Sequence, residues 1–249
     1  MFGVCLGTLA AAGCLAAGVA AAADGQGGTT APGAHCTPGI RSLAGSPTVA
    51  WAAAALRPTT AFQRPGVHPF ERFGLRNANG VDTVFGILAE RIDRHCRPNW
   101  YHVDLPIRPN GATGWVHAWV VRKFAVHSRI TVDLSQRRVR LYRNGKLVLS
   151  TPAAVGSSAT PTPLGRFYVN QRLIPSDPGG PFGPGAVGIS AFSPVLTGWT
   201  QGGPVAIHGT NEPWSIGHAV SNGCIRIPNA ALRRLFPAAP SGTPVLIHP

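Results

Sequence analysis

The sequence has few acidic residues and almost no lysine. Nine Asp and Glu stand against 22 Lys and Arg, and Lys123 and Lys146 are its two lysines, so arginine supplies most of the formal net charge of +13. A protein this basic favours polyanionic surroundings, such as nucleic acid or an anionic cell envelope. The charge forms no basic block, and even residues 136–140 alternate as a strand would. Because no binding motif accompanies this diffuse charge, we expect no nucleic-acid partner.

The sequence also lacks the residue spacings that hold metal ions. It contains nine histidines but no C-x-x-C or H-E-x-x-H motif, the patterns typical of zinc sites. We therefore expect no metal and no cofactor. Internal repeats are absent as well. The high counts of Gly (31) and Pro (24), with 44% hydrophobic residues, predict a globular, turn-rich, mainly β protein rather than a helical bundle.

Charged side chains are missing from residues 1–23. This apolar stretch ends in four alanines at 20–23, and it resembles a secretory signal peptide with an A-x-A cleavage site. The segment has no basic n-region, so an uncleaved membrane anchor is the second interpretation. Cys14 follows Ala-Gly as in a lipoprotein cleavage box, but the usual leucine is missing, and we interpret it as an ordinary apolar position. Residues 24–35 are rich in Gly, Thr, Ala and Pro and predict a linker. We expect export to a cell-wall or periplasm-like space.

Three cysteines follow the leader: Cys36, Cys96 and Cys224. In an oxidising compartment two of them would pair and one would remain. Cys36 and Cys96 fall in the same expected domain, so we predict a disulfide between them. The alternative is two structural thiols that never meet. Either way, Cys224 is the cysteine that needs an explanation.

A first β module is expected from residue 36 to 124. Residues 100–106 and 114–120 alternate as strands and flank a turn at 108–111. The strand, the Asn-Gly turn and the Gly-Trp-Val strand resemble bacterial SH3-like domains over roughly residues 75–122. Such domains are small barrels that often bind cell-wall peptides. A module that only spaces or supports the rest of the chain is the alternative.

The first module contains Trp100, Trp115 and Trp119. We expect these side chains in the core or in a domain interface rather than on a sugar-binding platform.

A second β region spans residues 127–249. Asn144-Gly145 is the strongest short hairpin signal in the chain. The best short helix covers residues 229–236, with Asn229 as its cap. The remaining pattern predicts strands at 129–134, 138–142, 147–150, 166–169 and 243–247.

Two segments of this region carry the chemistry. One is Val-Ala-Ile-His-Gly-Thr at 205–210, and the other is Ser-Asn-Gly-Cys-Ile-Arg-Ile at 221–227. A thiol reacts as its thiolate, and a nearby imidazole can take the proton and later return it to a leaving amine. His208 and Cys224 are sixteen residues apart, which suits two adjacent β segments joined by a loop. Gly223 leaves room for backbone N–H groups to converge on an oxyanion.

The run from His208 to Arg226 resembles the active-site signature of the L,D-transpeptidases, the YkuD-type catalytic domain. That signature has a His-Gly-Thr strand, a loop that often holds Ser-Ile-Gly (here 215–217) and a Ser-His-Gly-Cys motif. Thr-Pro-Thr-Pro-Leu-Gly-Arg-Phe at 160–167 is similar to a further strand of the family. The resemblance covers roughly residues 127–248 and implies a β-sandwich catalytic domain with one or two short helices.

The resemblance also implies roles for single residues. Cys224 would attack a stem-peptide donor, form a thioester and expel D-Ala, and an amine of a neighbouring stem would accept the acyl group. His208 would be the base, oriented through a backbone carbonyl near Gly209. The oxyanion hole and the substrate pocket would be formed by Ser221, Asn222, Gly223, Cys224 and Arg226. Asn222 stands where the family usually has His. Because Asn has no titratable group, we expect His208 to be the base. The expected partners are peptidoglycan stem peptides, and we expect a monomer.

Two other functions fit the same sequence. Water in place of the amine would make the protein an L,D-carboxypeptidase. The second is a non-catalytic protein that binds the cell wall through the SH3-like module and the basic charge. His218 is expected to be a solvated loop residue, with substrate contact as the alternative, and Trp214 is either a lid aromatic or ordinary loop packing.

Overall fold

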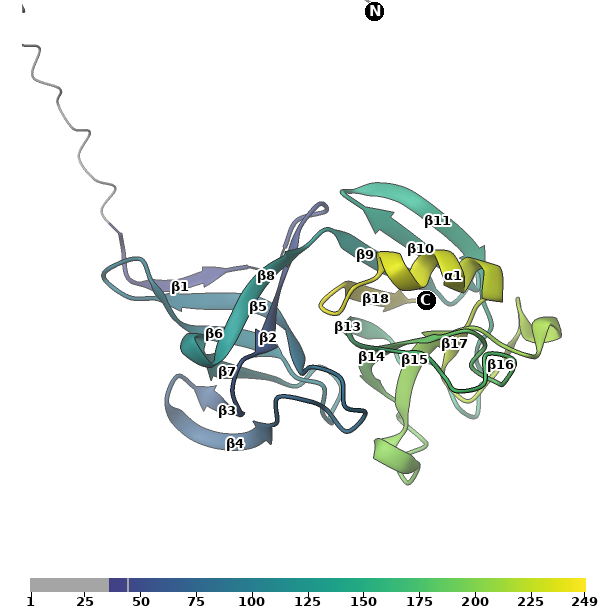
Figure 1. The fold of residues 1–249 in the computed structure, drawn as a ribbon, viewed down its shortest axis with the longest axis horizontal. Helices are drawn as coiled ribbons and strands as arrows, with labels where there is room; N and C mark the ends of the chain where they lie inside the picture. Colours follow the sequence, from purple (N-terminus) through teal and green to yellow (C-terminus); the bar gives the residue numbers. More distant parts are fainter. Residues whose placement is uncertain (1–35, 44) are drawn as a thin grey trace, which may run out of the picture. The chain divides into compact units, whose positions relative to one another are not determined.

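The computed structural model describes residues 36–43 and 45–249, and Cys36–Pro249 forms one compact unit. The predicted leader (1–23) and linker (24–35) lie outside the described residues. The described chain is mainly β, as expected, with a single α-helix (Figure 1). Within this part of the chain, no helix has the length and hydropathy that a membrane span requires.

The first β region is an eight-stranded sheet in the order β4-β3-β7-β6-β5-β2-β8, with β1 paired to β5. Alternate side chains of its strands turn inward, so that Tyr101 and Val103 of one strand pack with Phe85 and Val116 of its neighbours. A 3₁₀ turn, η1 (Ala118–Val120), leads into the last strand. The strands are β1 (Gly39–Ser42), β2 (Ala50–Ala55), β3 (Thr59–Arg64), β4 (Val67–Phe73), β5 (Val84–Ile92), β6 (Pro98–Asp104), β7 (Thr113–His117) and β8 (Val121–Val126).

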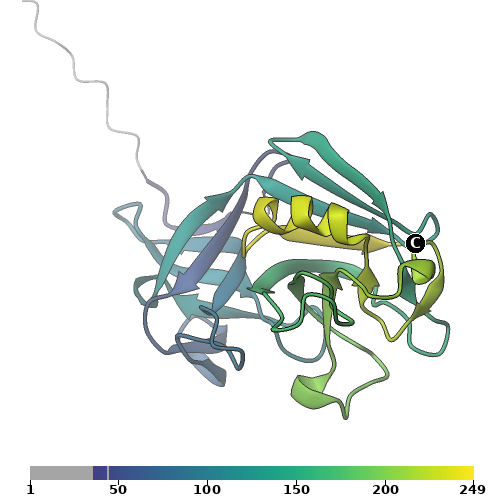
Figure 2. The ribbon, with the colours of Figure 1, turned by 45° about the vertical axis from the view of Figure 1, so that its right-hand side comes forward.

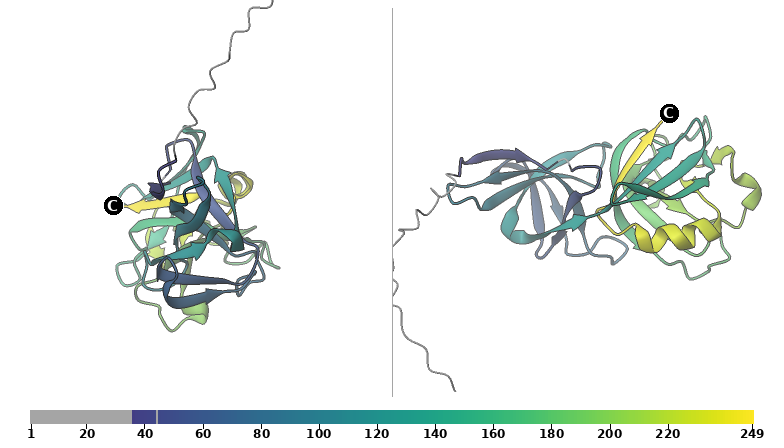
Figure 3. Two further views of the ribbon diagram at one scale, coloured as in Figure 1. Left: turned by 90° about the vertical axis from the view of Figure 1, so that its left-hand side faces the viewer. Right: turned by 90° about the horizontal axis from the view of Figure 1, so that it is seen from above.

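The second β region is also an eight-stranded sheet, in the order β11-β10-β9-β18-β13-β14-β15-β17. The pairs β18–β9 and β15–β17 are parallel, and β12 and β16 form a separate two-stranded sheet. Figure 3 shows that the strands of this region curve. The strands are β9 (Ser128–Asp133), β10 (Arg138–Arg143), β11 (Lys146–Pro152), β12 (Val155–Gly156), β13 (Gly165–Leu173), β14 (Ala186–Phe192), β15 (Pro204–His208), β16 (Ala219–Ser221), β17 (Ile225–Arg226) and β18 (Pro244–His248).

The hairpin predicted at Asn144-Gly145 is confirmed. It joins β10 to β11, and both turn residues have positive φ, 48° for Asn144 and 77° for Gly145. This is the backbone that a two-residue hairpin turn matching the strand twist requires, and Asn-Gly adopts it at low cost. The alternation of buried Val139 and Leu141 with half-buried neighbours follows directly from the two-residue period of a strand.

The predicted helix is present, but its predicted cap is wrong. Helix α1 spans Asn229–Ala238, and its N-cap is Pro228, with no capping hydrogen bond from a side chain. The Asn229 side chain is instead engaged with the segment after β15, as described below. Leu232 and Leu235 are fully buried against the second sheet, and Figure 2 shows the helix lying along that sheet.

The turn predicted at residues 108–111 bonds to the second β region. The carboxamide of Asn110 accepts from the Phe192 N–H and donates to its carbonyl, both at 2.8 Å. The Arg108 guanidinium donates to the carbonyls of Ser193 and Gly202, both at 2.6 Å. These contacts fix both ends of the connection between β14 and β15, which includes the 3₁₀ turn η2 (Thr200–Gly202).

The predicted disulfide between Cys36 and Cys96 is confirmed. The tryptophan prediction holds for Trp100 and Trp115, which are buried, but is wrong for Trp119, which is 63% exposed. Trp119 lies on η1, where the chain leaves the sheet, and the Arg57 guanidinium rests over its ring.

Candidate active site

The register of two parallel strands brings the predicted nucleophile and base together. β15 pairs with β17 so that Ile207 lies opposite Ile225 and His208 opposite Arg226, and Figure 1 shows the two strands side by side. One residue earlier, Cys224 falls opposite Ala206. Residues opposite one another share a face of a sheet, and so do residues two apart on a strand. Continued one residue before the start of β17, this register puts Cys224 and His208 on one face, diagonally across the strand pair.

His208 is buried, and its ring orientation is fixed by its own strand end. Its Nδ1 lies 2.5 Å from the Gly209 carbonyl oxygen. A carbonyl only accepts, so Nδ1 carries the hydrogen and Nε2 keeps a free lone pair. The orienting carbonyl that the sequence resemblance implied near Gly209 is present, and no carboxylate is needed to hold the tautomer.

Burial keeps both partners uncharged at rest. Burial is the main cause that lowers the pKa of His208 to about 4, and the positive charge of Arg226 lowers this pKa as well. The hydrogen bond to the Gly209 carbonyl raises it and offsets part of the shift. Burial likewise raises the pKa of the Cys224 thiol, against the lowering effects of the Ala206 N–H and of Arg226. At neutral pH the site thus holds a thiol and a neutral imidazole, and the imidazole is free to accept a proton.

The turn that presents Cys224 is held by one hydroxyl. Ser221 donates to the Cys224 carbonyl at 2.6 Å and accepts from the Gly223 N–H at 3.2 Å. Gly223 has φ of +106°, a conformation that a side chain would strain. Since the Gly223 amide is engaged, the open donors of this turn are the N–H groups of Asn222 and Cys224, for which residues 36–43 and 45–249 supply no acceptor.

The threonine- and proline-rich segment at residues 160–167 forms hydrogen bonds to this turn. The Thr160 hydroxyl donates to the Ser221 carbonyl at 3.0 Å. The buried Thr162 hydroxyl donates to the Gly223 carbonyl at 2.9 Å and accepts the Gly156 N–H at 2.8 Å. The segment therefore holds the backbone on which the sulfur is mounted.

Arg226 has a partner that the sequence did not indicate. Its guanidinium forms an ion pair with Glu212. The Glu212 backbone is itself fixed, since its N–H donates to the Thr210 hydroxyl at 2.9 Å and its carbonyl accepts from the Ser215 hydroxyl at 2.7 Å. Thr210 and Ser215 belong to the His-Gly-Thr and Ser-Ile-Gly motifs, so these motifs position a counter-charge as well as a loop.

The segment after His208 is bracketed by Asn229. Its carboxamide accepts the Thr210 N–H at 2.8 Å and donates to the Thr210 carbonyl at 3.0 Å. Sequence reasoning missed this role because Asn directly before a helical pattern has the same appearance as a cap.

An aromatic side chain that sequence reasoning also missed packs on the histidine. The Phe182 and His208 ring centroids are 5.0 Å apart, with 67° between the ring planes. Phe182 lies in the Pro- and Gly-rich loop between β13 and β14, where no periodic pattern marks a contact residue.

Other residues named from the sequence lie on the surface. His218 is exposed, as expected of a solvated loop residue. Trp214, on the 3₁₀ turn η3 (Pro213–Ser215), is 64% exposed. Among the described residues, no group of three or more His, Cys, Asp or Glu is arranged to hold a metal ion.

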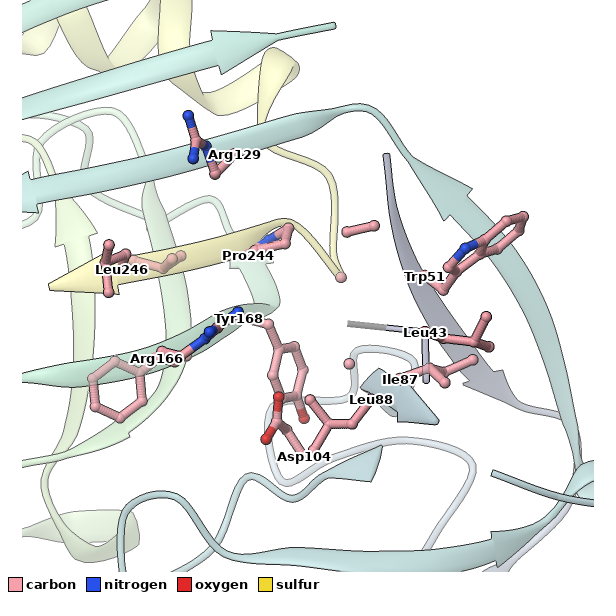
Figure 4. Close-up of a pocket in the computed structure, with 15 residues that line it drawn as sticks. Leu43, Trp51, Ile87, Leu88, Asp104, Arg129, Arg166, Tyr168, Pro244 and Leu246 are labelled. Carbon is pink, nitrogen blue, oxygen red and sulfur yellow. The ribbon is translucent and has the colours of Figure 1, made fainter. Parts of the chain in front are cut away.

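A separate cavity of about 300 Å³ contains neither Cys224 nor His208 (Figure 4). Its lining includes Asp104 and Tyr168 together with Arg166 and Leu246. Burial raises the pKa of Asp104 to about 6, and Arg166 opposes that shift. Tyr168 uses its hydroxyl to donate to the Val84 carbonyl at 3.0 Å.

A thiol and an imidazole on one face of a sheet are the arrangement that cysteine nucleophile enzymes use. Residues 127–247 match the family model of the YkuD L,D-transpeptidase catalytic domain. The candidate L,D-transpeptidase YkuD of Bacillus licheniformis is 44% identical over 121 residues, which cover 49% of this chain and 66% of the relative. Its counterpart in Bacillus subtilis is 38% identical over 125 residues, covering 50% and 68%. The chain belongs to the L,D-transpeptidase (YkuD) family.

The chain spans about two thirds of the length of these two relatives. A crystal structure of an Enterococcus faecium L,D-transpeptidase mutant is 29% identical over 49% of each chain, with a TM-score of 0.37, an overlap too low to add to the assignment. The family match begins at residue 127, so it assigns no family to the first β region, and the SH3-like character of that region stays a prediction.

Proposed function

We propose that the protein is an L,D-transpeptidase that cross-links peptidoglycan stem peptides through a thioester on Cys224. The observation that carries the proposal is the register of β15 and β17, which puts His208 and Cys224 on one face with the Nε2 lone pair of the histidine free. The proposed donor is a tetrapeptide stem, and the proposed leaving group is its terminal D-Ala.

In the first half-reaction, the Cys224 sulfur bonds to the carbonyl carbon that precedes D-Ala, and the C–N bond to D-Ala breaks. His208 Nε2 takes the thiol proton during the attack and gives it to the departing D-Ala nitrogen. In the second half-reaction, an amine of a neighbouring stem attacks the thioester. His208 takes a proton from that amine and returns it to the sulfur as the thioester breaks. The cycle consumes no cofactor.

The negative charge that develops on the carbonyl oxygen needs donors already in place. We assign this role to the N–H groups of Asn222 and Cys224, because the Gly223 amide is engaged with the Ser221 hydroxyl. Gly223 then allows the backbone conformation of the turn, and the hydrogen bonds of Ser221 stabilise it. Arg226 supplies positive charge that favours the thiolate, moderated by Glu212.

The test is incubation with a tetrapeptide-bearing muropeptide, with the products identified by mass. A cross-linked dimer plus free D-Ala supports the transpeptidase. Monomeric tripeptide plus D-Ala without dimer would instead support the L,D-carboxypeptidase, in which water takes the acyl group. Cys224→Ala and His208→Ala should each abolish product, whereas His218→Ala, which removes an exposed histidine of the same region, should retain it.

Two measurements on the same protein test the alternative of a non-catalytic wall-binding role. Intact mass after exposure to a carbapenem should show one acyl adduct that is lost in Cys224→Ala. Wild-type protein that carries no adduct but sediments with isolated sacculi would support the binding role and contradict the enzyme. The Cys36–Cys96 disulfide fits a site of action outside the cytoplasm, where peptidoglycan stems are the proposed partners and a monomer is the proposed state.

A further inference from the structure

The loop between β13 and β14 places an aromatic ring against the imidazole of His208. Phe182 and His208 meet at 5.0 Å between centroids with their planes 67° apart, the edge-to-face geometry that aromatic pairs favour. Phe182 is 46% exposed, so one side of its ring meets solvent while the other contacts His208. Its contribution to the hydrophobic core is therefore small, and the contact itself requires an explanation.

The backbone next to Phe182 is fixed to the segment that orients the histidine. Gly183 has φ of +59°, and a Cβ built there would lie 2.8 Å from the Gly209 Cα and 2.3 Å from the Asn229 Oδ1. The two glycine backbones thus approach more closely than side chains would permit. Asn229 in turn bonds to both backbone groups of Thr210. Phe182 is held against the same Gly209–Thr210 segment whose carbonyl accepts from His208 Nδ1.

We propose that Phe182 is a positioning residue for His208, which restrains the imidazole with Nε2 toward Cys224 and keeps water from its outer side. The inference rests on the proposed function and adds to it a residue that contacts the base. The Gly209 carbonyl alone holds one ring atom, and a ring held at one atom can still tilt about that hydrogen bond. Packing against a second ring restrains the tilt.

The proposal has a pH signature because burial is the main reason that the pKa of His208 is low. Among the described residues, Arg226 is the charged group that acts on the pKa of the imidazole. Arg226 is paired with Glu212, and the register of β15 and β17 puts the Cys224 thiol on the same face as His208. Phe182 carries no charge, so its removal changes hydration and leaves these groups in place. A hydrated imidazole has a higher pKa. His208 would then become protonated, and lose its function as a base, at a higher pH than in the wild type.

The experiment measures the rate of Cys224 acylation by a carbapenem from pH 4 to pH 8, in wild type, Phe182→Ala, Phe182→Leu and Trp199→Ala. Phe182→Ala should slow acylation by about 3- to 10-fold, the range expected for loss of an aromatic pair, and should move the acidic limb of the profile to higher pH. Phe182→Leu, which still covers the ring, should restore most of the limb position. Trp199→Ala is the matched control, since it removes an exposed aromatic ring before β15, at the end opposite His208.

A second measurement does not depend on turnover. The His208 ring resonances, titrated by NMR in the resting protein, should report a higher pKa in Phe182→Ala than in wild type or Trp199→Ala. An unchanged rate and an unchanged titration in a folded Phe182→Ala protein would overturn the proposal. If the wild type formed no adduct, the proposed function would fail, while the titration would still decide whether Phe182 shields the histidine.

Discussion

At the scale of single residues, the reactive pair is governed by burial. Burial lowers the pKa of His208 to about 4 and raises the pKa of Cys224. Burial therefore disfavours the charged form of both groups. The pair would then react by proton transfer during attack, rather than from a preformed thiolate and imidazolium. Arg226 lowers both pKa values, but it is paired with Glu212, which limits the positive potential at the sulfur.

This balance predicts how the free thiol is alkylated. The rate of iodoacetamide labelling of Cys224 should rise mainly above pH 9.0, the ordinary thiol value from which the pKa of Cys224 is raised. Glu212→Gln should shift the labelling profile toward lower pH, because Arg226 without its counter-charge favours the thiolate more strongly. Peptide mass mapping after timed labelling measures the rate at this cysteine, and glutathione under the same conditions is the reference. Full labelling at pH 6 would show instead that an ion pair exists at rest.

At the scale of elements, local signals and long-range contacts differ in what the sequence reveals. The hairpin at Asn144-Gly145 was predictable because two residues and their backbone preference determine it. The helix from Asn229 was predictable from its local pattern, but the role of Asn229 was not, because its partner Thr210 lies nineteen residues away. The role of Phe182 could not be predicted from the sequence either, because it depends on the contact that the loop after β13 makes with His208.

The turn that carries Cys224 provides a test at this scale. Thr162→Val keeps the shape of the side chain but leaves the Gly156 N–H and the Gly223 carbonyl without the hydroxyl that joins them. Loss of such buried partners costs about 1–3 kcal/mol, so urea unfolding monitored by circular dichroism should show a lower midpoint. Carbapenem acylation should slow as well, because the Cys224 backbone loses its support. Thr162→Ser keeps the hydroxyl and should lie near wild type. Equal stability of the two variants would contradict this account.

At the scale of the whole described unit, the disulfide and the Arg108 contacts join distant parts of the chain. Cys36 and Cys96 are separated by sixty residues, so their bond restricts the unfolded chain strongly. Such a cross-link contributes about 2–5 kcal/mol. Reduction should therefore lower the thermal midpoint of the first β region. The check is calorimetry with and without reductant, and Cys36→Ser/Cys96→Ser should match the reduced wild type. A midpoint independent of reductant would show that the bond is absent or without energetic effect.

Arg108 and Asn110 belong to a turn whose sequence indicated only a change of direction, yet they bond to the connection that leads into the histidine strand. Two carbonyls at opposite ends of this connection, those of Ser193 and Gly202, accept from one guanidinium. Arg108→Ala should therefore loosen residues 193–203, because no other side chain of the described residues donates to these carbonyls.

The expected result for Arg108→Ala is faster amide exchange in residues 193–203 and a loss of about 0.5–1.5 kcal/mol in the free energy of unfolding, because Arg108 is exposed. Hydrogen exchange read by mass spectrometry resolves the connection from the rest of the sheet. Arg91→Ala removes the same charge at an exposed position of β5 and controls for the change in net charge. If both variants exchanged like wild type, the contacts of Arg108 would have no measurable effect on this connection. If only Arg108→Ala exchanged faster, the first β region would be part of the structure that holds the strand of His208.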